Sequence, residues 1–293
     1  GSSALRSNTS GSNNTALGYF SLFSNSVGLR NAAVGKDALF SNTSGSDNTA
    51  LGYQSLYTNS VGINNIAVGT QALRSNTSGS DNTALGYFSL YANTTGGSNT
   101  AIGQNTLRFN LGGNNSALGK NALYSSTVGF NNTALGESSM QNNTSGSSNT
   151  SVGQFSMHFN SVGVDNSAIG VDALSQNTSG SQNISFGRSS GRYQADGATS
   201  ITDTDNSVFL GYDSRGLGNS ETNQIVIGHS TIGNGSNSVT LGNTSITKTV
   251  LRGDISGSVF SGSFVGDGSQ LTGISGGGGV SNELAIAYAI ALG

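Results

Sequence analysis

The sequence predicts an all-β fold, a parallel β-solenoid or β-roll in which the chain winds in 17-residue coils. The first observation is a repeat: the glycine that closes each NTALG-like block recurs every 17 residues from Gly1 to Gly187, with one 16-residue step between Gly103 and Gly119. The second is that glycine and asparagine occupy fixed columns, and both tolerate the positive φ of tight turns. The third is that large apolar residues recur at two fixed places in every copy.

Each of the eleven copies between Gly1 and Phe186 is too short for a helical hairpin and too long for one hairpin strand. We expect one coil per copy, with two short strands and two tight turns. Stacked coils lie about 4.8 Å apart, so eleven copies predict a rod roughly 50 Å long. The residue missing from the short copy falls in the turn after Leu107. Gly1 is already in register, so we expect the chain to be an internal piece of a longer protein.

The two apolar columns are the expected core. One follows the alanine of each block, and the other lies four residues after the closing glycine. In the first coils these columns are Leu17, Leu22, Val34, Leu39, Leu51, Leu56, Val68 and Leu73. Such a core is thin, and a roll with so little apolar material is marginal alone. The alanine-rich strand invites close approach by another surface, and a core shared around a symmetry axis would bury more. We therefore expect an oligomer.

One asparagine column is complete in all eleven copies. Asparagine side chains stacked coil upon coil can form a ladder of amide hydrogen bonds. We interpret the column as turn and ladder chemistry rather than a ligand site. Its members are Asn14, Asn31, Asn48, Asn65, Asn82, Asn99, Asn115, Asn132, Asn149, Asn166 and Asn183.

The chain divides into four predicted parts. Residues 1–187 form the regular solenoid, and residues 188–253 continue the roll irregularly through the blocks NSVFLG, NQIVIG and NSVTLG after a loop insertion, 188–205, which we expect to protrude. Residues 254–275 read as a hairpin-like fibre segment. Residues 276–293 combine a glycine linker with an apolar segment that we expect to be buried at a shared axis, and its pattern fits either a helix, slightly favoured, or a strand.

Composition excludes several classes of function. Only 33% of the residues are hydrophobic and 9% are charged, with a net charge of −3, 45 Gly and no Pro, Cys or Trp. The low charge argues against a nucleic-acid partner and against a polybasic membrane anchor. The absence of cysteine removes disulfides, thiol catalysis and cysteine-ligated metals. There is no apolar run of 18 residues, so we expect no membrane insertion in this segment.

No cluster of residues suggests catalysis or metal binding. His158 and His229 are the only histidines, and neither has the partners of a triad or a zinc site near it in sequence. Asp47, Asp81 and Asp165 share one column but lack the dense glycine–aspartate run of a calcium-binding roll. We expect no enzyme activity, no catalytic residues, no metal and no cofactor.

Tyrosines recur on alternate coils at Tyr19, Tyr53 and Tyr87. A row of exposed rings can bind sugars, and the same rings can instead pack between chains. Both interpretations stay open, with inter-chain packing favoured. A partial threonine column also raises the possibility of an ice-binding face, but five of its places hold other residues, which disfavours a flat ice-binding surface.

The blocks NSVFLG, NQIVIG and NSVTLG resemble the repeats in the head of trimeric autotransporter adhesins, a left-handed parallel β-roll of three chains. The longer NTALGYxSLxxNTSG copies, with VTLGNTSITKTVLRG and FVGDGSQLTGI, are more similar to the shafts of bacteriophage tail fibres. The resemblance covers nearly the whole chain. It implies an intertwined or side-by-side homotrimeric fibre, in which the apolar part of 276–293 would be a trimerising segment, although the 17-residue copy is longer than that of the adhesin head.

From this resemblance we expect the structural shaft of an extracellular trimeric fibre, phage or phage-like, that presents a distal receptor-binding tip for host attachment. Its partners would be two further copies of the chain and, through the tip, a glycan or cell-surface receptor. The place would be a virion tail fibre or a cell surface. The alternative is a bacterial surface trimeric adhesin whose rod itself binds glycans or the cell surface, through the tyrosines or the 188–205 loop. A depolymerase is the least supported alternative.

Overall fold

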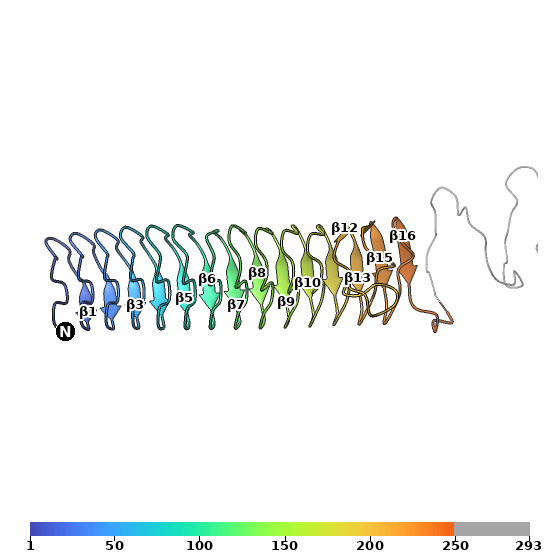
Figure 1. Ribbon diagram of the computed structural model, residues 1–293, viewed down its shortest axis with the longest axis horizontal. Helices are drawn as coiled ribbons and strands as arrows, with labels where there is room; N and C mark the ends of the chain where they lie inside the picture. The colour runs from blue at the N-terminus through green and yellow to red at the C-terminus, as the bar shows by residue number, and fades with distance from the viewer. Residues whose placement is uncertain (249–293) are drawn as a thin grey trace, which may run out of the picture. The chain divides into compact units, whose positions relative to one another are not determined.

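The computed structural model describes residues 1–248, which form a stack of coils with no helix (Figure 1). The prediction of an all-β parallel solenoid with 17-residue coils is confirmed. Fourteen strands form one parallel sheet, and each strand lies beside the next in chain order, apart from β12 and β14, which form a small sheet of their own. The predicted hairpin-like segment 254–275 and the trimerising segment 276–293 lie outside the described residues.

Each coil contributes one strand of three or four residues to the large sheet, not the two strands that we expected. The remainder of each coil consists of turns. The strands are β1 (Thr15–Leu17), β2 (Ala32–Val34), β3 (Thr49–Leu51), β4 (Ile66–Val68), β5 (Thr83–Leu85), β6 (Thr100–Ile102), β7 (Ser116–Leu118), β8 (Thr133–Leu135), β9 (Thr150–Val152), β10 (Ser167–Ile169), β11 (Ile184–Phe186), β12 (Thr204–Asp205), β13 (Val208–Leu210), β14 (Glu221–Thr222), β15 (Gln224–Ile227) and β16 (Ser238–Leu241).

The register of the sheet follows the sequence repeat, so equivalent residues lie directly above one another. Ala50 of β3 pairs with Ala67 of β4, one repeat later. The short copy keeps this register, because Ala101 of β6 still pairs with Ala117 of β7. The missing residue is absorbed in the turn between them, where Asn110 bonds to a glycine carbonyl two residues ahead instead of three.

The turn after each strand contains left-handed residues that are not glycine. In the third coil, φ is 139° at Gly52, 52° at Gln54 and 49° at Leu56. A left-handed leucine costs roughly 1–2 kcal/mol. Hydrogen bonds to both neighbouring coils hold it, because the Leu56 N–H donates to Ala72 O at 3.0 Å and the Gln54 N–H to Lys36 O at 3.0 Å. The sequence predicts positive φ only at glycine and asparagine, so the left-handed conformation of the buried leucines is a feature that the sequence did not indicate.

Gly52 also shows why the closing glycine does not vary. A Cβ atom on this residue would lie 2.5 Å from Gly69 O in the next coil, which is far inside van der Waals contact. The same contact recurs along the solenoid. The glycine column therefore sets how closely successive coils approach.

One of the two apolar columns predicted to form the core is buried, and the prediction is wrong for the other. Leu22, Leu39, Leu56 and Leu73 are completely buried. In contrast, Leu17 and Leu51 are 63% and 46% exposed, and Val34 and Val68 are only partly buried.

The physical reason is the alternation of side chains along a strand, in which neighbours point to opposite faces. The small middle residue, such as Ala50, points into the coil and is buried. Its larger neighbours Thr49 and Leu51 therefore point outward. The interior is narrow: in each regular coil the middle strand residue, a second small residue such as Ala38 or Ser55, and one leucine or methionine fill it beside the buried asparagines. The strand alanine is therefore not offered to another surface as we expected.

The insertion after Gly187 is more closely attached than a protruding loop. Ile201 is completely buried. Asn183 donates its side-chain amide to Thr204 O, so the end of the insertion takes the place of a turn glycine. β12 and β14 pair with each other in a small parallel sheet. The insertion thus packs on the solenoid and contributes a buried side chain and a short strand to it.

The buried leucine column allows a direct test of the core. Leu56→Ala removes a side chain that is completely enclosed, so we expect a loss of about 2–5 kcal/mol in the free energy of unfolding. Val61→Ala, at a turn position 49% exposed, is the control and should change it by well under 1 kcal/mol. Urea unfolding followed by circular dichroism measures both, and equal midpoints for the two variants would contradict this core.

Candidate interaction surface

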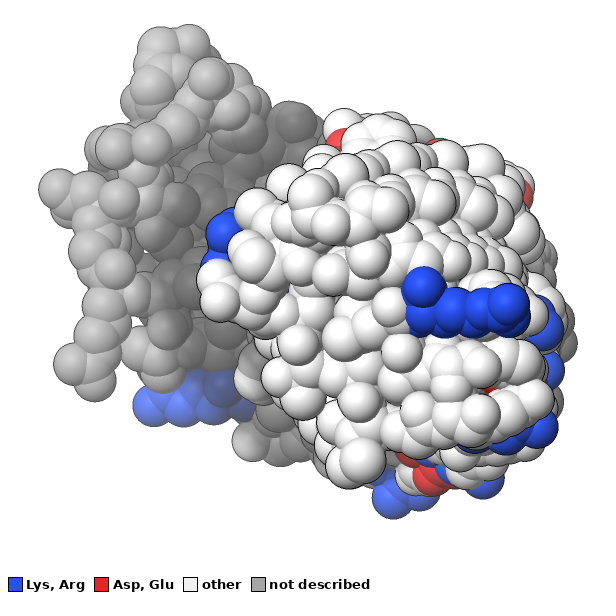
Figure 2. Space-filling view, turned by 90° about the vertical axis from the view of Figure 1, so that its left-hand side faces the viewer, with Lys and Arg blue, Asp and Glu red and all other residues white. Residues whose placement is uncertain are grey.

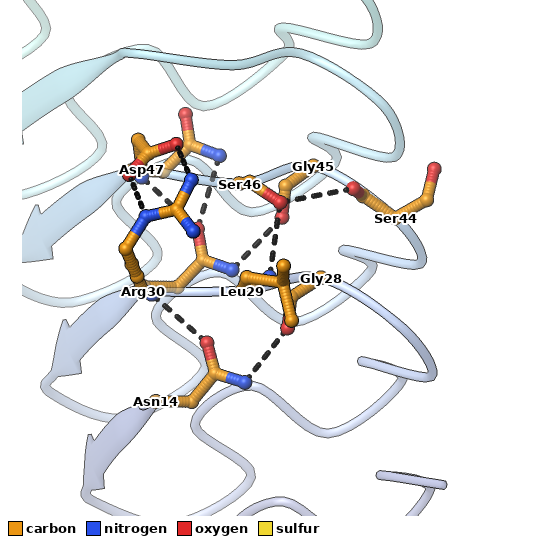
Figure 3. Close-up of polar contacts among 10 residues, drawn as sticks. Asn14, Gly28, Leu29, Arg30, Ser44, Gly45, Ser46 and Asp47 are labelled. Carbon is orange, nitrogen blue, oxygen red and sulfur yellow. Dashed lines mark hydrogen bonds and ion pairs between the residues drawn. The ribbon is translucent and has the colours of Figure 1, made fainter. Parts of the chain in front are cut away.

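The predicted asparagine column forms a ladder inside the solenoid, not on its surface (Figure 3). Asn48 donates its backbone N–H to the Asn31 side-chain oxygen at 3.0 Å, and its own amide to Gly62 O at 2.8 Å and to the same Asn31 oxygen at 3.2 Å. From Asn31 to Asn183 every member of the column is buried, and Asn14 at the first coil is partly buried. These amides bind the coils to one another, so the column carries no ligand site.

A second ladder, which we did not predict, runs beside the first and shares its acceptors, since Gly45 O accepts from both Asn31 and Asn42. The Asn42 amide donates to the Asn25 side-chain oxygen at 2.8 Å and to Gly45 O at 2.9 Å. The pattern repeats at Asn59 and Asn76. The signal was present in the NTSG and NSVG turns, whose first residue is almost always asparagine. We had assigned these turns to local geometry alone.

The outer face of the large sheet presents an uninterrupted apolar stripe. Every one of its fourteen strands places a large apolar residue at the same register position, and none of these side chains is buried in the single chain. We call this set the outer sheet stripe. It consists of Leu17, Val34, Leu51, Val68, Leu85, Ile102, Leu118, Leu135, Val152, Ile169, Phe186, Leu210, Ile227 and Leu241.

The stripe is long for a surface feature. With about 4.8 Å between strands it is roughly 60 Å long, and the three-residue strands make the face roughly 10 Å wide. This face, roughly 600 Å² in area, also carries threonine or serine at the outward position near the start of most strands, and its size is at the upper end of the largest apolar patches on soluble monomers. Charged residues make up only 9% of the chain, and the end of the solenoid that faces the viewer in Figure 2 is mostly uncharged.

The three tyrosines singled out from the sequence are exposed. Tyr19, Tyr53 and Tyr87 are 47%, 42% and 48% exposed, and each follows the glycine that ends a strand of the sheet. The Lys36 ammonium lies 5.9 Å from the Tyr53 ring centroid, and Tyr19 packs on Phe20 at 4.0 Å. Their exposure suits either sugar binding or packing against another chain.

Aromatic and arginine side chains stack along another face, one residue after the buried leucine. The Phe23 and Phe40 rings are parallel, with centroids 5.1 Å apart, and the Tyr57 ring follows at 5.2 Å. The Arg74 guanidinium then lies between the Tyr57 and Tyr91 rings, at 5.2 and 5.8 Å. We call this column the aromatic–arginine stack; it runs through Arg6, Phe23, Phe40, Tyr57, Arg74, Tyr91, Arg108 and Tyr124.

The histidines and the aspartate column are not brought into catalytic arrangements. His158 Nδ1 lies 3.0 Å from Ser138 O, and His229 stacks on Tyr212 with a centroid separation of 5.1 Å. Asp81 accepts a hydrogen bond from Asn64 at 3.0 Å. Within residues 1–248 no three metal-ligating side chains come together.

One ion pair joins neighbouring coils near the asparagine ladder (Figure 3). Arg30 donates to both carboxylate oxygens of Asp47, at 2.6 and 2.7 Å. This hydrogen bonding lowers the pKa of Asp47 and raises that of Arg30. A depressed carboxyl pKa means that the pair stabilises the fold at neutral pH and stops doing so as the pH falls through that pKa. Both side chains are exposed, so the effect is small.

Comparisons with known proteins give no relative: no protein-family description, no curated protein and no solved structure matches the chain. The part of the chain that the structure describes contains no helix with the length and apolar character needed to cross a bilayer. The repeat and its surfaces are therefore the only basis for a functional proposal.

The first asparagine ladder can be tested by removing one rung. Asn65→Ala leaves the Asn82 N–H, the Asn82 amide and Gly79 O without their bonds to Asn65. Gly79 O keeps its bond from Asn76 and the Asn82 amide keeps its bond to Gly96 O, so the Asn82 N–H is the group left unpaired. A buried unpaired group costs about 1–3 kcal/mol, and we expect a loss of this size in the free energy of unfolding.

The neighbouring Asn64 supplies a matched control. It is exposed, and its φ of 57° suits glycine, so Asn64→Gly should leave the urea midpoint nearly unchanged. If Asn65→Ala were as stable as Asn64→Gly, the ladder would not hold the coils together.

Proposed function

We propose that this chain is the structural shaft of an extracellular homotrimeric fibre that presents a distal receptor-binding tip, as in a phage or phage-like tail fibre. The observation that carries the proposal is the outer sheet stripe, which is apolar at every strand and unpaired in the single chain. A shaft needs length, stiffness and a seam along which copies associate, and it needs no chemical site.

The stripe supports an assembly in which copies lie in parallel with their sheets facing one axis. Each residue of the stripe would then meet its own equivalents in the other copies, which is the closed symmetry that oligomers prefer. An area of roughly 600 Å² per chain approaches the roughly 800 Å² per partner of a stable interface. The number three is taken from the resemblance to trimeric fibres.

The hydrogen bonding favours chains that lie side by side over chains that intertwine. Along the solenoid, backbone groups bond to the preceding and following coils of the same chain, as the Leu56 N–H does with Ala72 O. In an intertwined fibre these positions would be taken by other chains. Each chain therefore supplies its own rod, and the apolar seam joins the rods.

A bacterial surface adhesin whose rod binds glycans is the second candidate. The observation in its favour is that Tyr19, Tyr53 and Tyr87 are 42–48% exposed on alternate coils. A glycan array with the purified chain distinguishes the two functions. An adhesin of this kind should bind sugars on the array and lose that binding in Tyr53→Ala, whereas a shaft should bind none through this residue.

The trimer can be tested by placing charges in the seam. Wild-type protein should sediment at three times 29.4 kDa and form rods in electron micrographs. Leu51→Lys with Leu85→Lys puts six ammonium groups at the axis of a trimer, and we expect dissociation to monomers because buried unpaired charges are costly.

Ser44→Lys with Ser78→Lys is the matched control, since it adds the same charge at exposed turn positions on the same alternate coils. The control should remain trimeric. A monomeric wild-type chain, or a double-lysine stripe variant that stays assembled, would refute the proposal.

A further inference from the structure

The aromatic–arginine stack is interrupted near the end of the regular repeat. After Tyr124, the same repeat position holds Gln141, His158, Ser175 and Arg192. Ser175 has no ring or guanidinium to contribute. Beside it lies a surface hollow of about 320 Å³, lined by Phe155, His158, Phe159, Asp172, Ser175, Gln176 and Arg192.

The hollow has the height of one missing ring. His158 and Arg192 are separated by two coil steps, or about 10 Å. Where the stack is filled, one ring occupies each step, with centroids 5.1 Å apart at Phe23 and Phe40. The outer part of this layer, beyond Ser175, is therefore where a flat ring could enter, between the imidazole of His158 and the guanidinium of Arg192, while Ser175 itself lies buried beneath it.

Aromatic edges and faces form the walls. The His158 ring lies 5.3 Å from Phe155 and 4.5 Å from Phe159, nearly perpendicular to both. Phe155 and Phe159 are 37% and 41% exposed, so their rings are available to a ligand. His158 Nδ1 is engaged with Ser138 O, which fixes the orientation of the imidazole.

Polar atoms without partners lie at the base. Ser175 is only 1% exposed, and its Oγ has no hydrogen-bond partner among the described residues. Arg192 Nε is likewise buried and unpaired within residues 1–248, although Nη1 donates to Asp172 at 2.8 Å. Arg108 Nε is unpaired in the filled part of the stack as well, so the unpaired Ser175 hydroxyl is the feature that distinguishes the hollow. Rotation of Ser175 about χ1 to another staggered position can turn its hydroxyl toward the hollow.

We propose that this hollow binds one ring of a neutral sugar, which takes the place of the missing aromatic side chain. A pyranose presents C–H groups to aromatic faces and hydroxyls that both donate and accept. The site offers matching acceptors and donors, since Asp172 accepts, Arg192 donates, and Ser175 and Gln176 do both.

The charge and size of the site define the ligand class. The Asp172–Arg192 pair cancels its own charge, so the site has no preference for an ionic ligand. A purely apolar ring would leave the donors and acceptors unpaired. The site lies on the coils themselves, so the inference does not depend on the shaft having a particular tip.

The test is saturation-transfer NMR on the full chain with the methyl glycosides of glucose, galactose, mannose and N-acetylglucosamine. A single sugar ring in such a hollow should bind with a dissociation constant on the order of 1 mM. Ser175→Phe restores the stack of the earlier coils and fills the hollow. We expect it to abolish the transfer signal while leaving the thermal midpoint unchanged or raised, which separates occlusion from unfolding.

Phe159→Ala should weaken binding at least tenfold by removing one wall. Phe109 supplies the matched control, because it holds the same repeat position three coils earlier and is 40% exposed, yet it lies outside the hollow. Phe109→Ala should leave binding unchanged. No signal from any of the sugars at roughly ten times the expected dissociation constant, unchanged binding in Ser175→Phe, or signal only from a planar aromatic probe such as indole would overturn the proposal.

Discussion

The fold depends on the close, repeated contact between one coil and the next. Two interactions set this contact: the glycine whose Cβ would collide with the carbonyl above it, and the buried asparagine whose amide joins two coils at once. Each asparagine of this ladder satisfies backbone groups of the following coil, as Asn48 does for Gly62 O and the Asn65 N–H. A single coil has no stable alternative partner for these groups, so the coils are ordered only as a stack. Such quasi-one-dimensional order is typical of solenoids.

The same close contact explains why the surface is so apolar. In the regular coils the interior accepts two small residues, such as Ala33 and Ala38, and one leucine or methionine per coil, together with the asparagine amides. The remaining large apolar residues of each strand have no room inside and form the outer sheet stripe. A chain under no need to associate could place threonine or lysine at these positions, as is common on exposed strands. The retention of a large apolar residue on every strand is the strongest reason to assign the stripe to contacts between copies.

The sequence predicted the coil length, the parallel order and the first asparagine ladder, because all three follow from strict periodicity. It did not predict which strand residues face inward. Leu51 and Ala50 alternate in the same way whichever of them points to the core, and the usual preference of large apolar residues for the interior led to the wrong choice for Leu17, Val34, Leu51 and Val68. The stacking of the aromatic–arginine column could not be predicted from the sequence for a different reason. This column mixes phenylalanine, tyrosine and arginine, residues that share a flat face but belong to different chemical classes.

The central claim is that equivalent residues of the stripe meet across an axis in the assembled fibre. The chain has no cysteine, so a single spin label can be attached to a cysteine introduced at a chosen position. Leu118→Cys places the label in the middle of the stripe, and Thr127→Cys places it on an exposed turn of the next coil. Electron paramagnetic resonance of the fully labelled protein then reports how close the copies bring their labels. The account predicts strong dipolar broadening at Leu118 and little at Thr127. Equal broadening at the two positions, or broadening only at Thr127, would contradict it.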